Sequence, residues 1–134
     1  MNLSGQSVAE AFRYLPVEPE DMIVVYDEIE LPSGKLRVRP GGGHGGHNGV
    51  RSIIDSIGSR DFPRLRVGVG RPEGRRDPSG HLLSKVREDE RERFEKTIDV
   101  AVDALEDMLR IGVAEAMNRW NGRAPVGSEE EEKA

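Results

Sequence analysis

The sequence predicts an α/β protein with three layers, in which helices flank a central sheet that is mixed but mostly parallel. Segments with the apolar period of helices alternate along the chain with short β-branched runs that are typical of strands. One of these runs is continuously apolar, as the buried strands of parallel sheets are. A chain of 134 residues also has the length of one domain.

The first predicted elements are a short helix and a buried strand. Residues 7–15 place apolar side chains at helical spacing, and Pro16 then stops the helix. These side chains are Val8, Ala11, Phe12 and Leu15. Residues 22–26 form the continuously apolar run, which predicts a strand that is buried on both faces. Asp27 follows directly at the carboxyl end of this strand.

A second strand, a glycine-rich loop and a helix come next. Residues 35–39 alternate with period 2, which predicts a half-exposed strand with arginines on one face. Residues 41–49 are glycine except for His44, His47 and Asn48. Asn48 stands where an N-cap would stand, before a helix that reaches Gly58. The apolar stripe of this helix is Val50, Ile53, Ile54 and Ile57.

The last third of the chain predicts one more strand and two helices. Residues 65–70 form the strand, and a loop rich in proline, glycine and arginine follows it. Residues 88–110 predict a long surface helix, and Gly112 separates it from a shorter helix over residues 113–120. The expected buried stripe of the long helix is Phe94, Ile98, Ala101, Val102, Leu105 and Leu109.

Composition excludes several classes of protein. The chain contains no cysteine, so it has no disulfide framework, no thiolate nucleophile and no cysteine-ligated zinc. No apolar run approaches the roughly 20 residues of a membrane span, and we expect a soluble, cytoplasmic protein with no membrane association. Residues 1–125 are predicted to form a single domain, and residues 126–134 a disordered acidic tail.

Basic residues gather in the middle of a chain whose formal net charge is -5. Residues 31–80 hold ten basic residues, nine of them arginine, against four acidic ones, which gives this segment a net charge of +6. Arginine suits bidentate contact with phosphate oxygens, so a polyanionic partner is one interpretation. A solubilising face is the other, and charge alone does not separate the two.

The glycine-rich loop and Asp27 are the candidates for chemistry. So many glycines imply positive φ angles or the close approach of a large group. The loop has no Gly-Lys-Ser/Thr ending, which argues against a nucleotide P-loop, and His44 and His47 lack the third ligand that zinc needs. Asp27 follows a strand, where open α/β sheets place functional groups, but it could equally cap a turn with Glu28 and Glu30.

Four blocks of sequence together carry a resemblance that no single residue does. They are MNLSGQS at residues 1–7, VYDEIELP at 25–32, GGGHGGHNG at 41–49 and FPRLRVGVG at 62–70. In this order and spacing they resemble the bacterial-type peptidyl-tRNA hydrolases, over a stretch from Met1 to about Trp120. The resemblance implies hydrolysis of the ester between a peptide and the 3′ ribose of tRNA, with no metal or organic cofactor.

The resemblance also implies roles for individual residues. Asp27 matches an aspartate that orients and polarises a histidine, which in turn activates water. Asn2 matches a residue that hydrogen-bonds the substrate or the attacking water, and Asn48 matches one that binds the peptide side or a water. His47 lies beside Asn48, and Met1 helps to form the wall of the site.

Two arginines complete the implied site, and one part of the family pattern is absent. Arg39 and Arg66 match basic positions that clamp the terminal phosphate of tRNA, in agreement with the basic middle segment. The family's catalytic histidine belongs to an N-terminal segment that this sequence does not contain, and the pattern does not place His44 or His47 to replace it. We therefore expect a sheet truncated at its N-terminal strand, with an exposed edge, and impaired hydrolysis.

Two expectations about the working protein remain. The resemblance implies a monomer whose partner is peptidyl-tRNA. A non-catalytic module that binds tRNA or other RNA through the arginine clamp is the alternative function.

Overall fold

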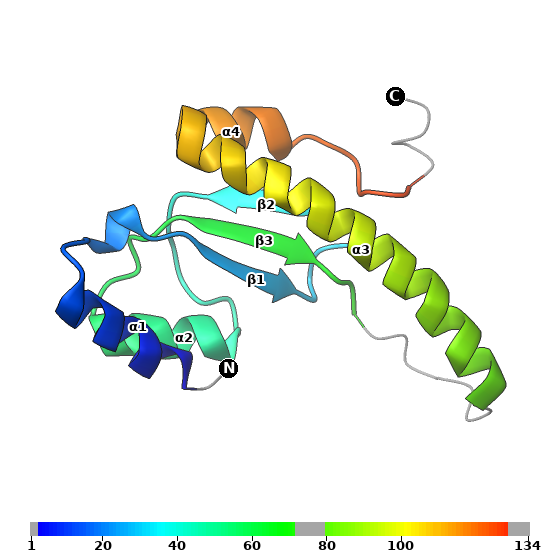
Figure 1. Cartoon of the computed structure of the whole chain (residues 1–134), viewed down its shortest axis with the longest axis horizontal. Coiled ribbons are helices and arrows are strands. Elements are labelled where there is room, and N and C mark those ends of the chain that lie inside the picture. Colours follow the sequence, from blue (N-terminus) through cyan, green and yellow to red (C-terminus); the bar gives the residue numbers. More distant parts are fainter. Residues whose placement is uncertain (1–2, 72–79, 129–134) are drawn as a thin grey trace. The chain divides into compact units, whose positions relative to one another are not determined.

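The computed structural model describes residues 3–71 and 80–128 (Figure 1). In chain order the elements are α1 (Ser4–Tyr14), the 3₁₀ helix η1 (Pro19–Asp21), β1 (Val24–Glu28), β2 (Leu36–Arg39), α2 (Asn48–Ile57), β3 (Arg64–Gly68), α3 (Gly80–Ile111) and α4 (Val113–Trp120). The predicted alternation of helices and strands is confirmed. Met1, Asn2, most of the arginine-rich loop after β3 and the end of the acidic tail lie outside the described residues.

The three strands form a mixed sheet in the order β1-β3-β2. Figure 1 shows β1 and β3 running in the same direction and β2 running against them. Beyond the strand ends, the Val69 N–H donates to the Glu28 carbonyl and continues the parallel pairing. The Gly68 N–H donates to the Lys35 carbonyl and continues the antiparallel one. The α/β class with a mixed sheet is therefore confirmed.

The two faces of β2 differ as its alternating sequence predicts. Leu36 and Val38 are buried, whereas Arg37 and Arg39 point to the opposite face and are half-buried. β1 departs from prediction, because Val25 is 46% exposed and the strand is not buried on both faces. β1 is also an edge strand of the described sheet, so one backbone edge is unpaired there in addition to the exposed face. An exposed edge was expected.

The chain divides into two compact units, and the first comprises residues 1–25 and 39–64. Here α1 packs closely against α2 at Gly5, where an added Cβ would lie 2.1 Å from the Ser52 carbonyl oxygen. The Gly5 N–H also donates to Ser52 Oγ at 3.0 Å. Val50 and Ile53 of α2 are buried, as predicted, while Leu15, at the end of the predicted stripe of α1, is exposed.

The second unit comprises residues 26–38 and 65–134. α3 is longer than predicted and buries Thr97, Ala101, Ala104 and Met108. The predicted buried stripe of α3 was largely wrong, because only Ala101 of that set is buried and Leu105 is half-buried. The others are exposed, namely Phe94, Ile98, Val102 and Leu109. Small side chains on the buried face allow a closer approach to neighbouring elements than the larger apolar ones would.

The segment after α4 pairs with the free edge of β2. The Asn121 side chain accepts from the Val38 N–H at 2.7 Å and donates to the Val38 carbonyl at 3.0 Å. Further along, the Val126 N–H donates to the Gly34 carbonyl at 2.9 Å, and Val126 itself is buried. This pairing places the end of α4 at the β2 edge of the sheet.

Candidate functional site

In the first unit, the glycine-rich loop between β2 and α2 requires its glycines for their backbone angles. Gly42, Gly45 and Gly46 have φ angles of 130°, 55° and 85°. Residues with a Cβ rarely adopt such angles, so one of the two expectations for this loop is confirmed. The Gly42 N–H also donates to the Arg60 carbonyl, which ties the start of the loop to the turn after α2.

Arg64, at the start of β3, also holds this loop in place. It was not among the candidate residues predicted from the sequence. Its side chain is fully buried, and its guanidinium donates to the carbonyls of Gly42, Gly43 and Arg60. It also stacks over the Phe62 ring, with 4.3 Å from its guanidinium carbon to the ring centroid. The single hint in the sequence was an arginine at the start of a buried strand.

Both histidines of the loop use their Nδ1 atoms locally. His44 Nδ1 accepts from the Gly46 N–H at 2.9 Å, and His47 Nδ1 accepts from the Val50 N–H at 3.2 Å. His47 is therefore the N-cap of α2, and the prediction that Asn48 caps it was wrong by one residue. With Nδ1 accepting, the neutral His47 ring carries its proton on Nε2.

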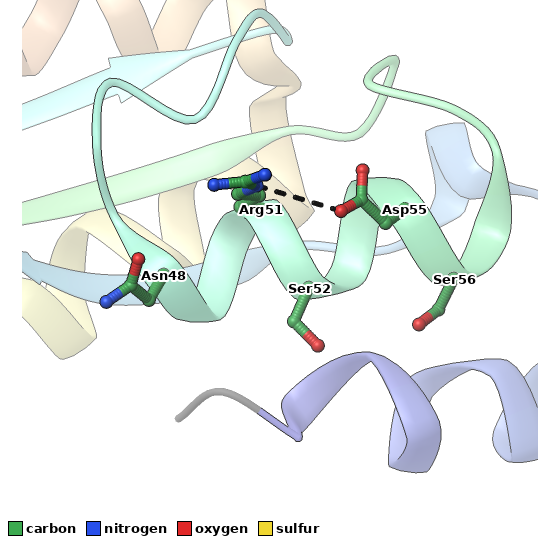
Figure 2. Close-up of a pocket in the computed structure, with 5 residues that line it drawn as sticks. All are labelled: Asn48, Arg51, Ser52, Asp55 and Ser56. Carbon is green, nitrogen blue, oxygen red and sulfur yellow. Dashed lines mark ion pairs between the residues drawn. The ribbon is translucent and has the colours of Figure 1, made fainter.

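Asn48 opens an exposed polar face of α2. Figure 2 shows the five side chains that line an open cavity of about 340 Å³. They are Asn48, Arg51, Ser52, Asp55 and Ser56, at the spacing of one helical face. Arg51 Nε lies 3.8 Å from Asp55 Oδ2, and both side chains are well exposed. Hydrogen-bonding groups of both kinds therefore lie next to Asn48, the one predicted residue in this cavity.

In the second unit, Asp27 lies within β1 rather than after its end. Its side chain is exposed, whereas its neighbours Tyr26 and Glu28 point to the opposite face and are buried. On that opposite face, Arg66 of β3 donates from Nε to the Tyr26 hydroxyl at 2.9 Å. Arg66 also lies 3.9 Å from a Glu28 carboxylate oxygen. The predicted clamp residue is thus part of an internal network, with 21% of its side chain exposed.

The arginines of β2 are less satisfied than Arg66. The Nε atoms of Arg37 and Arg39 are buried and have no hydrogen-bond partner among residues 3–71 and 80–128. The positive charge of this strand has an effect on Lys35, whose pKa is lowered by burial and, to a smaller extent, by Arg37. Lys35 Nζ donates to the carbonyls of Asn121 at 2.7 Å and Arg123 at 2.6 Å.

The predicted site residues are therefore distributed over both units. Arg39, His47 and Asn48 belong to the first unit, and Asp27 and Arg66 belong to the second. Among residues 3–71 and 80–128, no group of three potential metal ligands lies close enough together to hold an ion. None of the described helices is sufficiently long and apolar to cross a membrane.

These features define an α/β protein with a glycine-rich loop, a polar helix face and an exposed strand carboxylate. A family model described as Peptidyl-tRNA hydrolase matches residues 1–130 of the chain. The peptidyl-tRNA hydrolase of Syntrophotalea carbinolica is 46% identical over 123 residues, which are 92% of this chain and 64% of that protein. The one of Rhodococcus opacus is 44% identical over 119 residues, 89% of this chain and 63% of that protein.

The solved structures agree with the sequence comparisons. The crystal structure of peptidyl-tRNA hydrolase from Acinetobacter baumannii has a TM-score of 0.75 and 38% sequence identity to this chain. The match covers 93% of this chain and 63% of the Acinetobacter chain. The chain belongs to the peptidyl-tRNA hydrolase family, and the predicted three-layer α/β class is confirmed. It spans a little under two thirds of the length of these relatives.

Proposed function

We propose that this protein hydrolyses the ester bond between a peptide and tRNA and so releases free tRNA for reuse in translation. The observation that carries the proposal is the family match over residues 1–130. Relatives with 44 to 46% identity are named peptidyl-tRNA hydrolase. We propose that the protein acts as a cytoplasmic monomer on peptidyl-tRNA, without a metal or an organic cofactor.

Asp27 is the positioning residue of the proposed reaction. A carboxylate that accepts a hydrogen bond from an imidazole fixes the tautomer of the ring and stabilises its protonated form. The imidazole can then take a proton from the water that attacks the ester carbonyl carbon. The exposed side chain of Asp27 on β1, flanked by buried neighbours, supports this role because the strand backbone fixes the face of the sheet on which the carboxylate lies.

Asparagine side chains are proposed to bind the reacting groups. An amide both donates and accepts hydrogen bonds, so Asn2 and Asn48 can contact the attacking water and the ester or peptide carbonyl. His47 is proposed to bind the peptide side, because its position as the N-cap of α2 places its ring directly beside Asn48. Met1 is proposed to help form the apolar wall of the site.

Arg39 and Arg66 are proposed to bind the terminal phosphate of the tRNA. Guanidinium groups match the geometry of phosphate oxygens. Support comes from the half-buried Arg39, whose Nε has no hydrogen-bond partner in the described part of the chain. Arg66 would have to share its charge between the phosphate and Glu28.

The expected rate of ester hydrolysis depends on the histidine that acts as the general base. Since no residue of this sequence matches the family's catalytic histidine, we propose that hydrolysis by the 134-residue chain is slow. Added imidazole should then raise the rate, since it can supply the missing base beside Asp27. Glu10, an exposed carboxylate of α1, provides a matched control for substitution of Asp27.

The decisive experiment measures release of free tRNA from an N-acetylaminoacyl-tRNA, with and without imidazole. We expect hydrolysis above the buffer rate, an increase with imidazole, and at least a tenfold loss of that increase in Asp27→Asn. Glu10→Gln should behave like the unchanged chain. No hydrolysis above buffer at any imidazole concentration, together with intact tRNA binding, would overturn the proposal and favour non-catalytic RNA binding.

A further inference from the structure

We infer that Asn121 is a site of spontaneous deamidation, and that the reaction releases the segment after α4 from the β2 edge. The chain contains two Asn-Gly pairs, Asn48-Gly49 and Asn121-Gly122. In such a pair the glycine has no Cβ to hinder its backbone nitrogen, which can attack the side-chain amide of the preceding asparagine. The inference concerns the second unit and does not depend on the proposed hydrolysis.

The reaction needs water alone as a co-reactant. The Gly122 backbone nitrogen loses its proton and forms a bond to Cγ, the carbonyl carbon of the Asn121 side chain. The bond from Cγ to Nδ2 breaks, and Nδ2 leaves as ammonia with that proton. Water then opens the cyclic imide at one of its two carbonyls, which leaves aspartate or isoaspartate at position 121.

The surroundings of Gly122 favour attack by its nitrogen. Gly122 is exposed and lies in the turn after α4, where a Cβ would meet no atom within 4 Å. Its N–H forms no hydrogen bond with the residues that the structure describes. Gly49, in contrast, is buried and lies within α2, whose backbone holds it in place. We therefore expect Asn121 to react before Asn48.

The pairing with β2 controls when the reaction can occur. Asn121 Oδ1 accepts from the Val38 N–H at 2.7 Å, and Nδ2 donates to the Val38 carbonyl at 3.0 Å. Lys35 Nζ also donates to the backbone carbonyl of Asn121 at 2.7 Å. These bonds hold Cγ at the sheet edge, so cyclisation requires that they open locally first. The rate of deamidation is therefore set by how often the segment leaves the edge.

The product cannot restore the pairing. An amide both donates and accepts hydrogen bonds, whereas an ionised carboxylate only accepts them. One oxygen of the new carboxylate can accept from the Val38 N–H, but the other then faces the Val38 carbonyl, which is also an acceptor. The new charge also attracts Lys35 away from the Asn121 and Arg123 carbonyls. Deamidation therefore releases the segment irreversibly.

The test incubates the full 134-residue chain in mildly alkaline buffer and follows both Asn-Gly pairs by peptide mapping with mass spectrometry. We expect conversion at Asn121 ahead of Asn48. Gly122→Ala leaves the pairing with Val38 in place and should slow conversion at Asn121 by about tenfold or more, because the added methyl group hinders the attacking nitrogen. Equal conversion of Asn121 in this variant would exclude the cyclic route and overturn the inference.

Lys35→Met tests whether the pairing controls the rate. It removes one anchor of the segment and should raise the rate at Asn121 several-fold while that at Asn48 stays unchanged. Lys96→Met, at an exposed lysine of α3, should alter neither rate. The inference fails if Asn121 reacts equally fast in the native chain and in urea, or if it does not react in either the unchanged chain or Lys35→Met.

Asn121→Asp tests the consequence of the reaction. Hydrogen exchange at the Val38 and Val126 amides should accelerate by about tenfold or more, because both lose the order of the paired edge. Asn118→Asp, the same change at an exposed position of α4, should leave both amides unchanged. Far-UV circular dichroism verifies that each variant keeps its helices. Unchanged exchange in Asn121→Asp would show that the product keeps the pairing, and would overturn the inference.

Discussion

Arg64 is a fully buried arginine that faces carbonyl oxygens rather than a carboxylate among the described residues. Its charge is balanced by the dipoles of Gly42, Gly43 and Arg60. This arrangement lets a loop with three positive φ angles keep one conformation. It also links the loop to the start of β3 through one side chain.

We expect Arg64→Met to loosen this loop. The substitution keeps most of the side-chain length but removes the charged donor from the carbonyls of Gly42, Gly43 and Arg60, which lowers the free energy of unfolding by about 1–3 kcal/mol. Urea unfolding measures this loss, and hydrogen exchange should accelerate at Gly42. Arg51→Met, at an exposed arginine of α2, is the control and should change stability by about 0.5 kcal/mol or less. Equal losses in both variants would contradict the assigned role.

Asp107 makes the stability of the α3 and α4 pair depend on pH. Hydrogen bonds from Arg110, Trp120 and Arg119 lower the pKa of this carboxyl from 3.8 to about 2. A folded-state pKa below the unfolded value stabilises the fold above the unfolded pKa, and this stability is lost as the pH falls through the folded pKa. The sensitive window is therefore between about pH 4 and pH 2.

We predict that Asp107→Asn removes this part of the acid sensitivity. The variant should be less stable than the unchanged chain at pH 6, and the difference should shrink as the pH approaches 2. Urea unfolding at several pH values measures it. Asp103→Asn, at an exposed position on the same helix, should follow the unchanged chain at every pH. A difference for Asp107→Asn that stays constant with pH would show that its charge plays no part.

At the scale of elements, the segment after α4 protects the free edge of β2. The Asn121 amide forms both hydrogen bonds with the Val38 backbone that a neighbouring strand would form. Lys35 fixes the same segment by donating to the Asn121 and Arg123 carbonyls. At Val38, therefore, the backbone groups that another strand would need are already occupied.

Asn121→Ala should therefore weaken the β2 edge more than it weakens α4. The Val38 N–H and carbonyl both lose partners, and we expect a loss of about 1–2 kcal/mol in unfolding free energy. Faster hydrogen exchange at the Val38 amide would locate the effect. Asn118→Ala, at an exposed position of α4, should leave that amide unchanged. If both variants exchanged alike at Val38, the amide pairing would not protect the strand.

The elements also show where sequence reasoning reached its limit. The order and type of the elements and the two faces of β2 were predictable, because they follow from local periodicity. The buried side of α3 was not, since Phe94 and Ile98 look more apolar than Thr97 and Ala101. Which side is buried depends on how closely helix and neighbour approach, and periodicity carries no information on that distance.

At the scale of the whole molecule, the proposed contacts with tRNA phosphate depend on individual arginines rather than on the formal net charge of -5. The family blocks predicted roles for Asp27, Asn48 and Arg66 from sequence, but not the network that holds Arg66 to Tyr26 and Glu28. The sequence around an arginine does not show whether its guanidinium forms hydrogen bonds or ion pairs within the protein. The two proposed phosphate ligands therefore differ physically, because Arg66 has protein partners to lose and the Nε of Arg39 has none among the residues that the structure describes.

This difference predicts a split between binding and stability. Arg39→Ala should weaken tRNA binding and flatten the plot of log affinity against log salt by about 0.7 to 0.9 for one lost phosphate contact, with unfolding unchanged. Arg66→Ala should flatten it similarly but also destabilise the fold, because the buried Glu28 loses its cation. Filter binding between 50 and 200 mM salt and urea unfolding measure the two effects. Arg13→Ala, an exposed arginine of α1, is the control, and an unchanged salt slope in Arg39→Ala would remove that residue from the phosphate site.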